Sequence, residues 1–448
     1  MTLTLATYFG LFNISRIMLF LFLKEIIMRI RVILSLIFGI LWSCTSKVES
    51  ITTTVTENNA DALERPYVIL ISLDGFRWDY VEKFNPPNLS KFVESGVKAE
   101  SLIPSYPTKT FPNHYTIATG MYPDSHGLVG NTHYSVKNKS VYSIGQRKKV
   151  QDGSYYGGTP IWVQANANGM VSASFFFVGS EADIKGIHPT YYYDYDGKIT
   201  NDKRINQTLQ WLEMPEKQRP HMITLYFSDM DDAGHRYGPN NEVEINKALQ
   251  KVDSDLGVLF DAVDASELPI HIVIVSDHGM HEVKTQDLIA YDDIRNDELF
   301  IGMNNGSIIN IHPKDPSKTD SIFNLLKSQE NRFKVYKTEN SPHFDYIPSH
   351  ENWGSIQLIA DDGLYFSSNN RIEGRIKYDR NITGEHGFPH QMKDMHGIFY
   401  AKGPKLKKGH TIPSFKNIHV YPLLCEILGI DPPKDIDGTL EPIKDALK

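Results

Sequence analysis

Acidic and histidine side chains stand directly after apolar runs that lie far apart in this sequence. The runs are YVILISL, HMITLYF and HIVIVS, and a further histidine occurs in the segment GEHG. Carboxylate oxygens combined with imidazole nitrogens suit zinc, with manganese or iron as alternatives. We therefore expect two Zn²⁺ ions at one catalytic site. The candidate ligands are Asp74, Asp231, His235, Asp277, His278 and His386.

Thr110 stands in the segment PTKTFPNHYTIATG and is the candidate nucleophile of such a site. We expect a helix that begins near Pro112 and ends at Gly120. Thr110 then lies at the helix N-terminus, where free backbone N–H groups favour an anion. A free threonine hydroxyl is a weak nucleophile, and coordination to a divalent ion would activate it. The alternative is that Thr110 only caps the helix, but the metal-ligand candidates favour catalysis.

The apolar runs that precede the aspartates are rich in β-branched residues, which is typical of buried strands. In open α/β sheets, ligands bind beyond the carboxyl ends of the strands, so residues distant in sequence can converge there. A single aspartate after a strand more commonly forms a turn or caps a helix. Asp229 and Asp232 compete with Asp231 as ligands. The four-residue spacing from Asp231 to His235 favours Asp231, because it places both side chains on one helix face.

From residue 66 onward, short apolar runs alternate with helical patterns, which predicts a mostly parallel sheet covered by helices on both faces. Residues 243–263 carry apolar side chains at helical spacing and predict an amphipathic helix. Residues 281–380 have a different texture, with strand-like runs separated by long polar segments. We interpret them as an inserted α+β subdomain, which leaves residues 65–280 and 381–448 as the core.

Residues 1–44 have the features of a leader. Two arginines, an apolar stretch and the segment LWSC, which ends at Cys44, are arranged as in a bacterial secretory signal with a lipidation cysteine. Met28 is a possible true start, and a transmembrane anchor is the alternative. Either arrangement places the catalytic part outside the cytoplasm, in the periplasm or as a membrane-anchored lipoprotein. Residues 45–64 are polar and predict a flexible tether.

The 448 residues carry a formal net charge of −8, which argues against a nucleic-acid polymer as the main partner. A small anionic substrate remains compatible with this charge, because bound metals can reverse the sign locally. The chain has two cysteines, Cys44 and Cys425. If Cys44 carries lipid, no disulfide can form, and Cys425 is most simply a buried apolar residue.

Four segments together resemble the nucleotide pyrophosphatase/phosphodiesterase family of the alkaline phosphatase superfamily. They are PTKTFPNHYTIATGMYPDSHGLVGN, DMDDAGHRYGP, SDHGM and GEHGFPHQMKDMHGIFYAKGP, and the resemblance covers about residues 66–430. It implies a three-layer αβα core of the alkaline phosphatase kind. It also implies one zinc bound by Asp231, His235 and His386, and another bound by Asp74, Asp277, His278 and the Thr110 oxygen.

The resemblance further implies contacts with the substrate. Asn131 and the backbone N–H of Phe111 would hold a non-bridging phosphate oxygen. Phe111, Tyr195 and Tyr226 would hold a nucleobase between aromatic rings, although each of these rings alone would more often belong to the core. Phe177 falls where some family members have tryptophan.

Other residues of the motifs are interpreted without a chemical role. Lys109 is interpreted as a solvated lysine, although its place beside Thr110 could favour an anionic substrate. Four histidines are interpreted as structural or ordinary residues, namely His114, His126, His343 and His350.

Together these features predict a two-zinc phosphodiesterase/pyrophosphatase. It would hydrolyse nucleotide diesters or phosphoanhydrides to nucleoside 5′-monophosphates through a phosphothreonine intermediate. One alternative is a phosphomonoesterase, and another is a diesterase for lysophospholipid or choline phosphate, because tyrosines can also line a choline pocket. A sulfatase is disfavoured because the chain has no Cys-x-Pro-x-Arg segment. A distant alternative is a non-catalytic surface lipoprotein.

Overall fold

The computed structural model describes residues 54–448. Its centre is a sheet with the strand order β19-β2-β18-β9-β1-β8-β6-β7. The bounds are β19 His410–Ile412, β2 Val97–Ala99, β18 Phe399–Lys402, β9 Ile270–Val275, β1 Tyr67–Leu73, β8 Met222–Phe227, β6 Ser172–Phe175 and β7 Tyr191–Tyr193. Strand β1 is parallel to β8 and β9, β6 is parallel to β7 and β8, and β2 is parallel to β19. Strand β18 runs antiparallel to β2 and β9.

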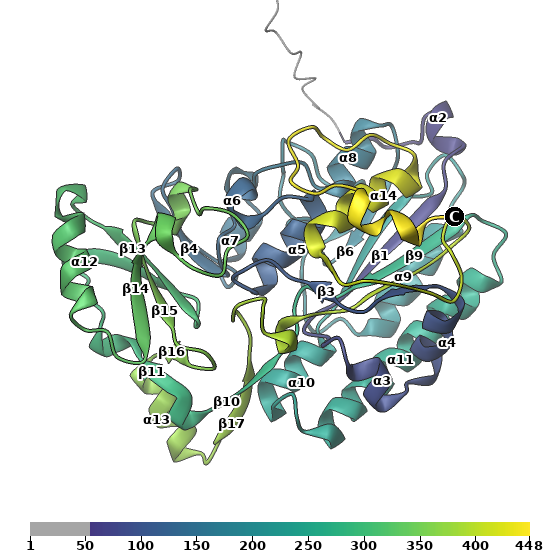
Figure 1. Cartoon of the computed structure of the whole chain (residues 1–448). Helices are drawn as coiled ribbons and strands as arrows, with labels where there is room; N and C mark the ends of the chain where they lie inside the picture. Colours follow the sequence, from purple (N-terminus) through teal and green to yellow (C-terminus); the bar gives the residue numbers. More distant parts are fainter. Residues whose placement is uncertain (1–53) are drawn as a thin grey trace, which may run out of the picture. The chain divides into compact units, whose positions relative to one another are not determined.

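Helices cover both faces of this sheet (Figure 1). Successive residues of β1 alternate between the faces: Val68 and Leu70 pack in one apolar core, and Ile69 and Ile71 in the other. The first core includes α5 Thr110–Thr119, α8 Ile161–Ala167 and α14 Val420–Leu428. The second includes α3 Tyr80–Phe84, α4 Pro87–Ser95, α9 Asn201–Leu212, α10 Asp229–Tyr237 and α11 Glu242–Asp264. The predicted mostly parallel sheet with helices on both faces is confirmed.

The segment 281–380, here called the insert, contains a four-stranded antiparallel sheet with its own apolar core. The order is β12 Phe300–Asn304, β13 Ile308–Pro313, β15 Ile356–Ala360 and β14 Phe333–Lys337, and α12 Thr319–Lys327 packs against it. A further pair, β11 Leu288–Ala290 with β16 Tyr365–Ser367, lies within the insert, and the pair of β10 His281–Lys284 with β17 Ile382–Glu385 connects it with the following chain. Helix α13 Asn369–Lys377 precedes β17. The division at residues 281 and 380 stays a prediction.

Smaller elements complete the described chain. They are α2 Ala60–Leu63, β3 Leu102–Ile103 with β20 Phe415–Lys416, α6 Pro123–His126, β4 Thr132–Ser135 with β5 Ser140–Ser143, and α7 Arg147–Val150. Cys425 is a free, buried cysteine of α14. Within residues 54–448, no helix is both long and apolar enough to cross a membrane.

The predicted tether, residues 45–64, extends too far along the chain. Asn58 is buried, and its side-chain amide donates hydrogen bonds of 2.8 Å to the carbonyls of Glu216 and Arg219. Asn59 caps α2 by accepting a bond from the Ala62 N–H. These polar side chains satisfy backbone groups of the body, so a polar composition did not signify a free segment here. The leader at 1–44 and residues 45–53 lie outside the described residues.

Candidate active site

The candidate ligands that follow strands meet at one edge of the central sheet. Asp74 comes directly after β1, and Asp277 comes two residues after β9. Asp231 lies in the first turn of α10, which follows β8. Because β9, β1 and β8 are parallel neighbours, their carboxyl ends lie side by side. Gly75 permits the close approach: its φ is +65°, and a Cβ there would lie 2.8 Å from the Asp231 Cα.

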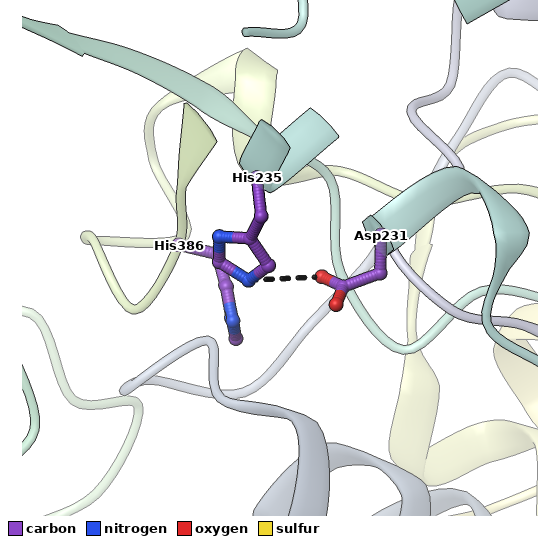
Figure 2. Close-up of side chains that lie close together, drawn as sticks. All are labelled: Asp231, His235 and His386. Carbon is purple, nitrogen blue, oxygen red and sulfur yellow. Dashed lines mark ion pairs between the residues drawn. The ribbon is translucent and has the colours of Figure 1, made fainter. Parts of the chain in front are cut away.

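The first cluster consists of Asp231, His235 and His386 (Figure 2). Asp231 and His235 share a face of α10, and the His235 Nε2 lies 3.3 Å from the Asp231 Oδ1. His386 enters from the segment that follows β17, and one potential ligand atom from each residue lies within 4.8 Å of the others. Asp229 points elsewhere and accepts a hydrogen bond of 2.9 Å from the Asn201 amide. The structure thus brings the predicted aspartate, and not Asp229, to the two histidines.

The second cluster is centred on the Nε2 of His278. This nitrogen lies 3.0 Å from the Asp277 Oδ2, 3.4 Å from the Asp74 Oδ1 and 3.2 Å from the Thr110 Oγ1. Asp231 also lies within 4.8 Å of Asp74 and His278, so its carboxylate stands between the two clusters. All seven residues predicted as ligands or nucleophile are therefore gathered in one place.

Backbone carbonyls fix the orientation of the three candidate histidine ligands. The Nδ1 atoms of His235, His278 and His386 lie 2.8 Å from the carbonyl oxygens of Gly384, Gly279 and Thr108, respectively. An Nδ1–H that donates to a carbonyl leaves the lone pair on Nε2, which is the arrangement of a metal ligand.

His114 differs from these histidines, although it lies near Asp74 and Asp277. Its Nδ1 is 2.9 Å from the Thr110 carbonyl oxygen and its Nε2 is 2.8 Å from the Ser72 hydroxyl. Its Nδ1 also lies 3.2 Å from the Asp277 Oδ2, and its structural role stays a prediction.

The carboxylates of the site are crowded, and one oxygen of each lacks a donor. Burial raises the pKa of Asp74 and of Asp277 well above the usual range, and the neighbouring carboxylates raise both further. Asp74 Oδ1, Asp231 Oδ1 and Asp277 Oδ2 are buried and have no hydrogen-bond partner among the described residues. Buried oxygens of this kind are expensive unless a donor or a cation faces them. The donor set therefore fits divalent cations.

The three candidate histidine ligands differ in the direction of their pKa shifts. Burial lowers the pKa of His278 to about 3 and that of His386 well below the usual value, so both are neutral. Their rings stack at a centroid distance of 3.6 Å, which two charged rings would not tolerate. Burial would also lower the pKa of His235, but the charge of Asp231 outweighs it and raises this pKa to about 9. Neutral imidazoles are the form that binds metal.

Helix α5 presents the candidate nucleophile at its N-terminus. The helix begins at Thr110, two residues earlier than predicted, because the Asn113 N–H donates to the Lys109 carbonyl. Gly120 ends it with a φ of +69°, as predicted from the sequence. The Phe111 N–H donates to the Asn131 Oδ1 at 2.9 Å, which holds this amide beside the first turn.

An aromatic cavity of about 310 Å³ opens beside Thr110. Its walls include three of the four predicted substrate contacts, namely Phe111, Tyr195 and Tyr226, together with Phe176, Phe177, Arg147 and Glu181. The rings of Tyr195 and Tyr226 are 6.2 Å apart at an angle of 69°, so they form adjacent walls and not two parallel plates. Asn131 faces a neighbouring polar hollow that Lys109 also lines.

Two residues have roles that the sequence analysis missed. The Tyr226 hydroxyl donates a hydrogen bond of 2.6 Å to the Asp74 Oδ2, so this ring also orients a candidate ligand. Lys109 is 5% exposed, and the prediction of a solvated lysine is wrong. Its Nζ donates to the Tyr365 hydroxyl at 2.9 Å and to the His386 carbonyl at 2.7 Å, and burial lowers its pKa to about 8. All three contacts join residues more than 150 positions apart, and no local pattern signals them.

Comparisons with known proteins agree with this geometry. Residues 68–389 match the family model described as type I phosphodiesterase / nucleotide pyrophosphatase. A venom phosphodiesterase of Crotalus durissus collilineatus is 34% identical over 397 residues, which cover 86% of this chain and 47% of the relative. Human ectonucleotide pyrophosphatase/phosphodiesterase family member 1 is 34% identical over 405 residues, covering 86% of this chain and 42% of the relative. The chain thus spans less than half the length of these two relatives.

Solved structures give the same result at the level of the fold. Murine ectonucleotide pyrophosphatase / phosphodiesterase 5, as an inactive threonine-to-alanine variant in complex with AMP, superposes with a TM-score of 0.78 at 27% identity. This match covers 86% of the present chain and 100% of the murine chain. The human protein of the same name gives a TM-score of 0.78 at 28% identity, with 85% and 100% coverage. The chain belongs to the type I phosphodiesterase / nucleotide pyrophosphatase family.

Proposed function

We propose that this protein is a two-zinc phosphodiesterase/pyrophosphatase that hydrolyses nucleotide diesters or phosphoanhydrides to nucleoside 5′-monophosphates. The observation that carries the proposal is the convergence of the Thr110 hydroxyl with six ligand side chains beside an aromatic cavity. The murine relative that was solved with AMP, as an inactive threonine-to-alanine variant, supports both the nucleotide and the nucleophile.

The residues divide between two metal positions. Asp231, His235 and His386 would hold one ion, and Asp74, Asp277, His278 and Thr110 would hold the other. The bound ions would lower the pKa of the Thr110 hydroxyl and offset the charge of the three carboxylates and of the substrate.

Thr110 carries the covalent chemistry. Its oxygen, after loss of the proton to solvent, attacks the phosphorus, and the bond from phosphorus to the leaving oxygen breaks. The leaving oxygen keeps the electron pair and takes a proton from solvent. Water then attacks the phosphothreonine ester, and the Thr110 hydroxyl is restored as the monophosphate departs. The helix N-terminus at Thr110 and the Asn131 amide, whose Oδ1 accepts the Phe111 N–H, would face the phosphoryl oxygens.

The aromatic cavity favours a nucleobase over a choline headgroup. The guanidinium of Arg147 lies 5.9 Å from the centroid of the Tyr195 ring, where a quaternary ammonium group would bind. Arg147, which is ion-paired with Glu181, occupies this face, so a quaternary ammonium group would compete with the guanidinium for the ring, whereas a flat neutral base can stack on Tyr195 or Tyr226. We therefore place the nucleoside in this cavity, against Phe111, Tyr195 and Tyr226.

We also propose that the enzyme works outside the cytoplasm. Its relatives include venom phosphodiesterases and proteins named ectonucleotide pyrophosphatases. A lipid at Cys44 or an apolar anchor within residues 1–44 would attach it to a membrane.

Hydrolysis by the full chain of the nitrophenyl ester of thymidine 5′-monophosphate tests the function. We expect chelator-sensitive turnover that exceeds the turnover of nitrophenyl phosphate and of nitrophenyl phosphocholine. Preference for one of the latter two esters would instead establish a phosphomonoesterase or a choline-phosphate diesterase.

Thr110→Ala tests the nucleophile. We expect it to lower kcat at least about 1,000-fold, because no other group replaces the attacking oxygen. Thr110→Ser keeps a hydroxyl and should retain part of the activity. Zinc per chain, measured by atomic absorption, should change little in either variant, since the carboxylates and imidazoles remain. Near wild-type turnover by Thr110→Ala would show that the assignment of the nucleophile is wrong.

A further inference from the structure

The segment from Glu385 to Gly387 carries the candidate ligand His386, and the insert contacts this segment directly at Glu385 and Gly387 and through Lys109 at His386. Arg371 of α13 forms an ion pair with the buried Glu385 carboxylate. Ser307, in the turn between β12 and β13, donates a hydrogen bond to the Gly387 carbonyl. Between them, the His386 carbonyl accepts a bond of 2.7 Å from the Lys109 Nζ, and this ammonium also donates to the Tyr365 hydroxyl at 2.9 Å.

Lys109 connects the nucleophile to the same group. It is the residue before Thr110, and its ammonium lies 5.2 Å from the centroid of the Tyr365 ring. Gly387 has a φ of +112°, and a Cβ there would lie 2.7 Å from the Lys109 Cε, so this glycine makes room for the lysine stem. The carboxylate of Glu385 and the guanidinium of Arg371 lie beside the Tyr365 hydroxyl. The core alone therefore does not supply the surroundings of Lys109.

We propose that the insert is a positioning clamp for the metal site. Tyr365, acting through Lys109, and Ser307 fix the backbone carbonyls of His386 and Gly387, and Arg371 fixes Glu385 before them. This inference rests on the proposed function, because it assigns these residues to the placement of a metal ligand. The candidate ligands and the nucleophile all lie outside residues 281–380. The proposal therefore gives the insert a role at the metal site although it supplies no ligand.

The physical reason is that metal affinity depends on the atoms that orient a ligand as well as on the ligand. The imidazole of His386 is held at Nδ1 by the carbonyl of Thr108, the residue before Lys109. Removing an outer contact of this kind typically lowers metal affinity or activity about 10- to 100-fold. None of Lys109, Ser307, Tyr365 and Arg371 lines the aromatic cavity, so binding of the nucleoside there should be unaffected.

The test uses Tyr365→Phe and Ser307→Ala in the full chain. Each change deletes one hydroxyl and leaves the ligand set intact. The matched controls are Tyr421→Phe and Thr338→Val, which delete buried hydroxyls that donate to the carbonyls of Thr159 and Gly354, away from the site. Zinc affinity of the apo chain is measured by competition with a chromophoric chelator, and kcat and KM are measured with the thymidine diester.

We expect Tyr365→Phe and Ser307→Ala each to weaken one of the two zinc sites about tenfold and to lower kcat without raising KM. Both controls should match the wild type in zinc affinity and in kcat. Unchanged zinc affinity in the insert variants would overturn the proposal, and so would an equal loss in the controls, which would indicate general loosening. A wild-type chain that neither binds zinc nor hydrolyses the diester would instead contradict the proposed function itself.

Discussion

Tyr226 combines two tasks that a substitution can separate. Its ring lines the aromatic cavity, and its hydroxyl donates to the Asp74 Oδ2 at 2.6 Å. Tyr226→Phe should therefore weaken zinc binding about tenfold and lower kcat, because the Asp74 carboxylate loses the donor that orients it. KM should stay near the wild-type value, since the ring remains. Chelator competition and steady-state kinetics measure the two effects, and Tyr421→Phe serves as the control for loss of a buried hydroxyl. A raised KM with unchanged zinc affinity would show that the hydroxyl serves the substrate and not the carboxylate.

Candidate ligands were predictable from the sequence where they directly follow a strand. Asp74 and Asp277 follow β-branched runs, and the geometry of parallel sheets brings such positions together. Asp231 was distinguishable from Asp229 because helical spacing to His235 decides the shared face. Lys109 was not predictable, because the groups that bury it, Tyr365 and the His386 carbonyl, follow it by 256 and 277 residues. A lysine with no partner nearby in the sequence is normally predicted to be solvated.

Among the elements, α4 depends on a side chain from another helix. Its N-cap residue is Pro86, which has no side-chain acceptor, and the N–H groups of Asn88 and Leu89 donate instead to Asp253 of α11, at 3.1 and 2.7 Å. Asp253→Ala would leave the buried Leu89 N–H and the partly buried Asn88 N–H without this partner. We expect it to lower the free energy of unfolding by about 2 kcal/mol.

Urea unfolding of Asp253→Ala beside Asp261→Ala measures this contribution. Asp261 is an exposed residue of the same α11, so its replacement controls for the effect of alanine on the helix. Equal stability of the two variants would mean that water replaces the Asp253 carboxylate at no cost.

Long elements with a clear period were predictable, and short ones were not. The 243–263 pattern corresponds to α11, Glu242–Asp264, because eight of its residues face the core at helical spacing. Strands β2 and β18, of three and four residues, carry no usable period, yet they complete the sheet on the far side of β9. Their places follow from packing between distant parts of the chain. Helix α5 begins at Thr110 and not near Pro112, because a backbone hydrogen bond, and not the proline, determines its first residue.

At the scale of the whole molecule, polar composition misled at the chain's beginning, where Asn58 and Asn59 serve as hydrogen-bonding anchors. In the interior of the protein, many histidines are buried and neutral. Burial lowers the pKa of His126 to about 3 and those of His133, His271 and His312 to about 4. In the unfolded chain these groups take up protons near pH 6.5, as ordinary histidines do. Stability at neutral pH therefore depends on keeping them uncharged.

The sign of the resulting pH dependence follows from linkage. Below about pH 6.5 these histidines bind protons in the unfolded chain but stay unprotonated in the folded chain. The free energy of unfolding therefore rises with pH and falls on acidification. His126 contributes up to about 1.4 kcal/mol per pH unit. Its Nδ1 accepts the Leu128 N–H and its Nε2 donates to the Thr116 hydroxyl, and protonation would break the first bond. Urea unfolding of the wild type and of His126→Gln in chelator, from about pH 7.5 to 4.5, should show a flatter slope for the variant. Because the metal-site residues titrate alike in both proteins, the difference isolates His126, and parallel slopes would mean that it is already protonated in the fold.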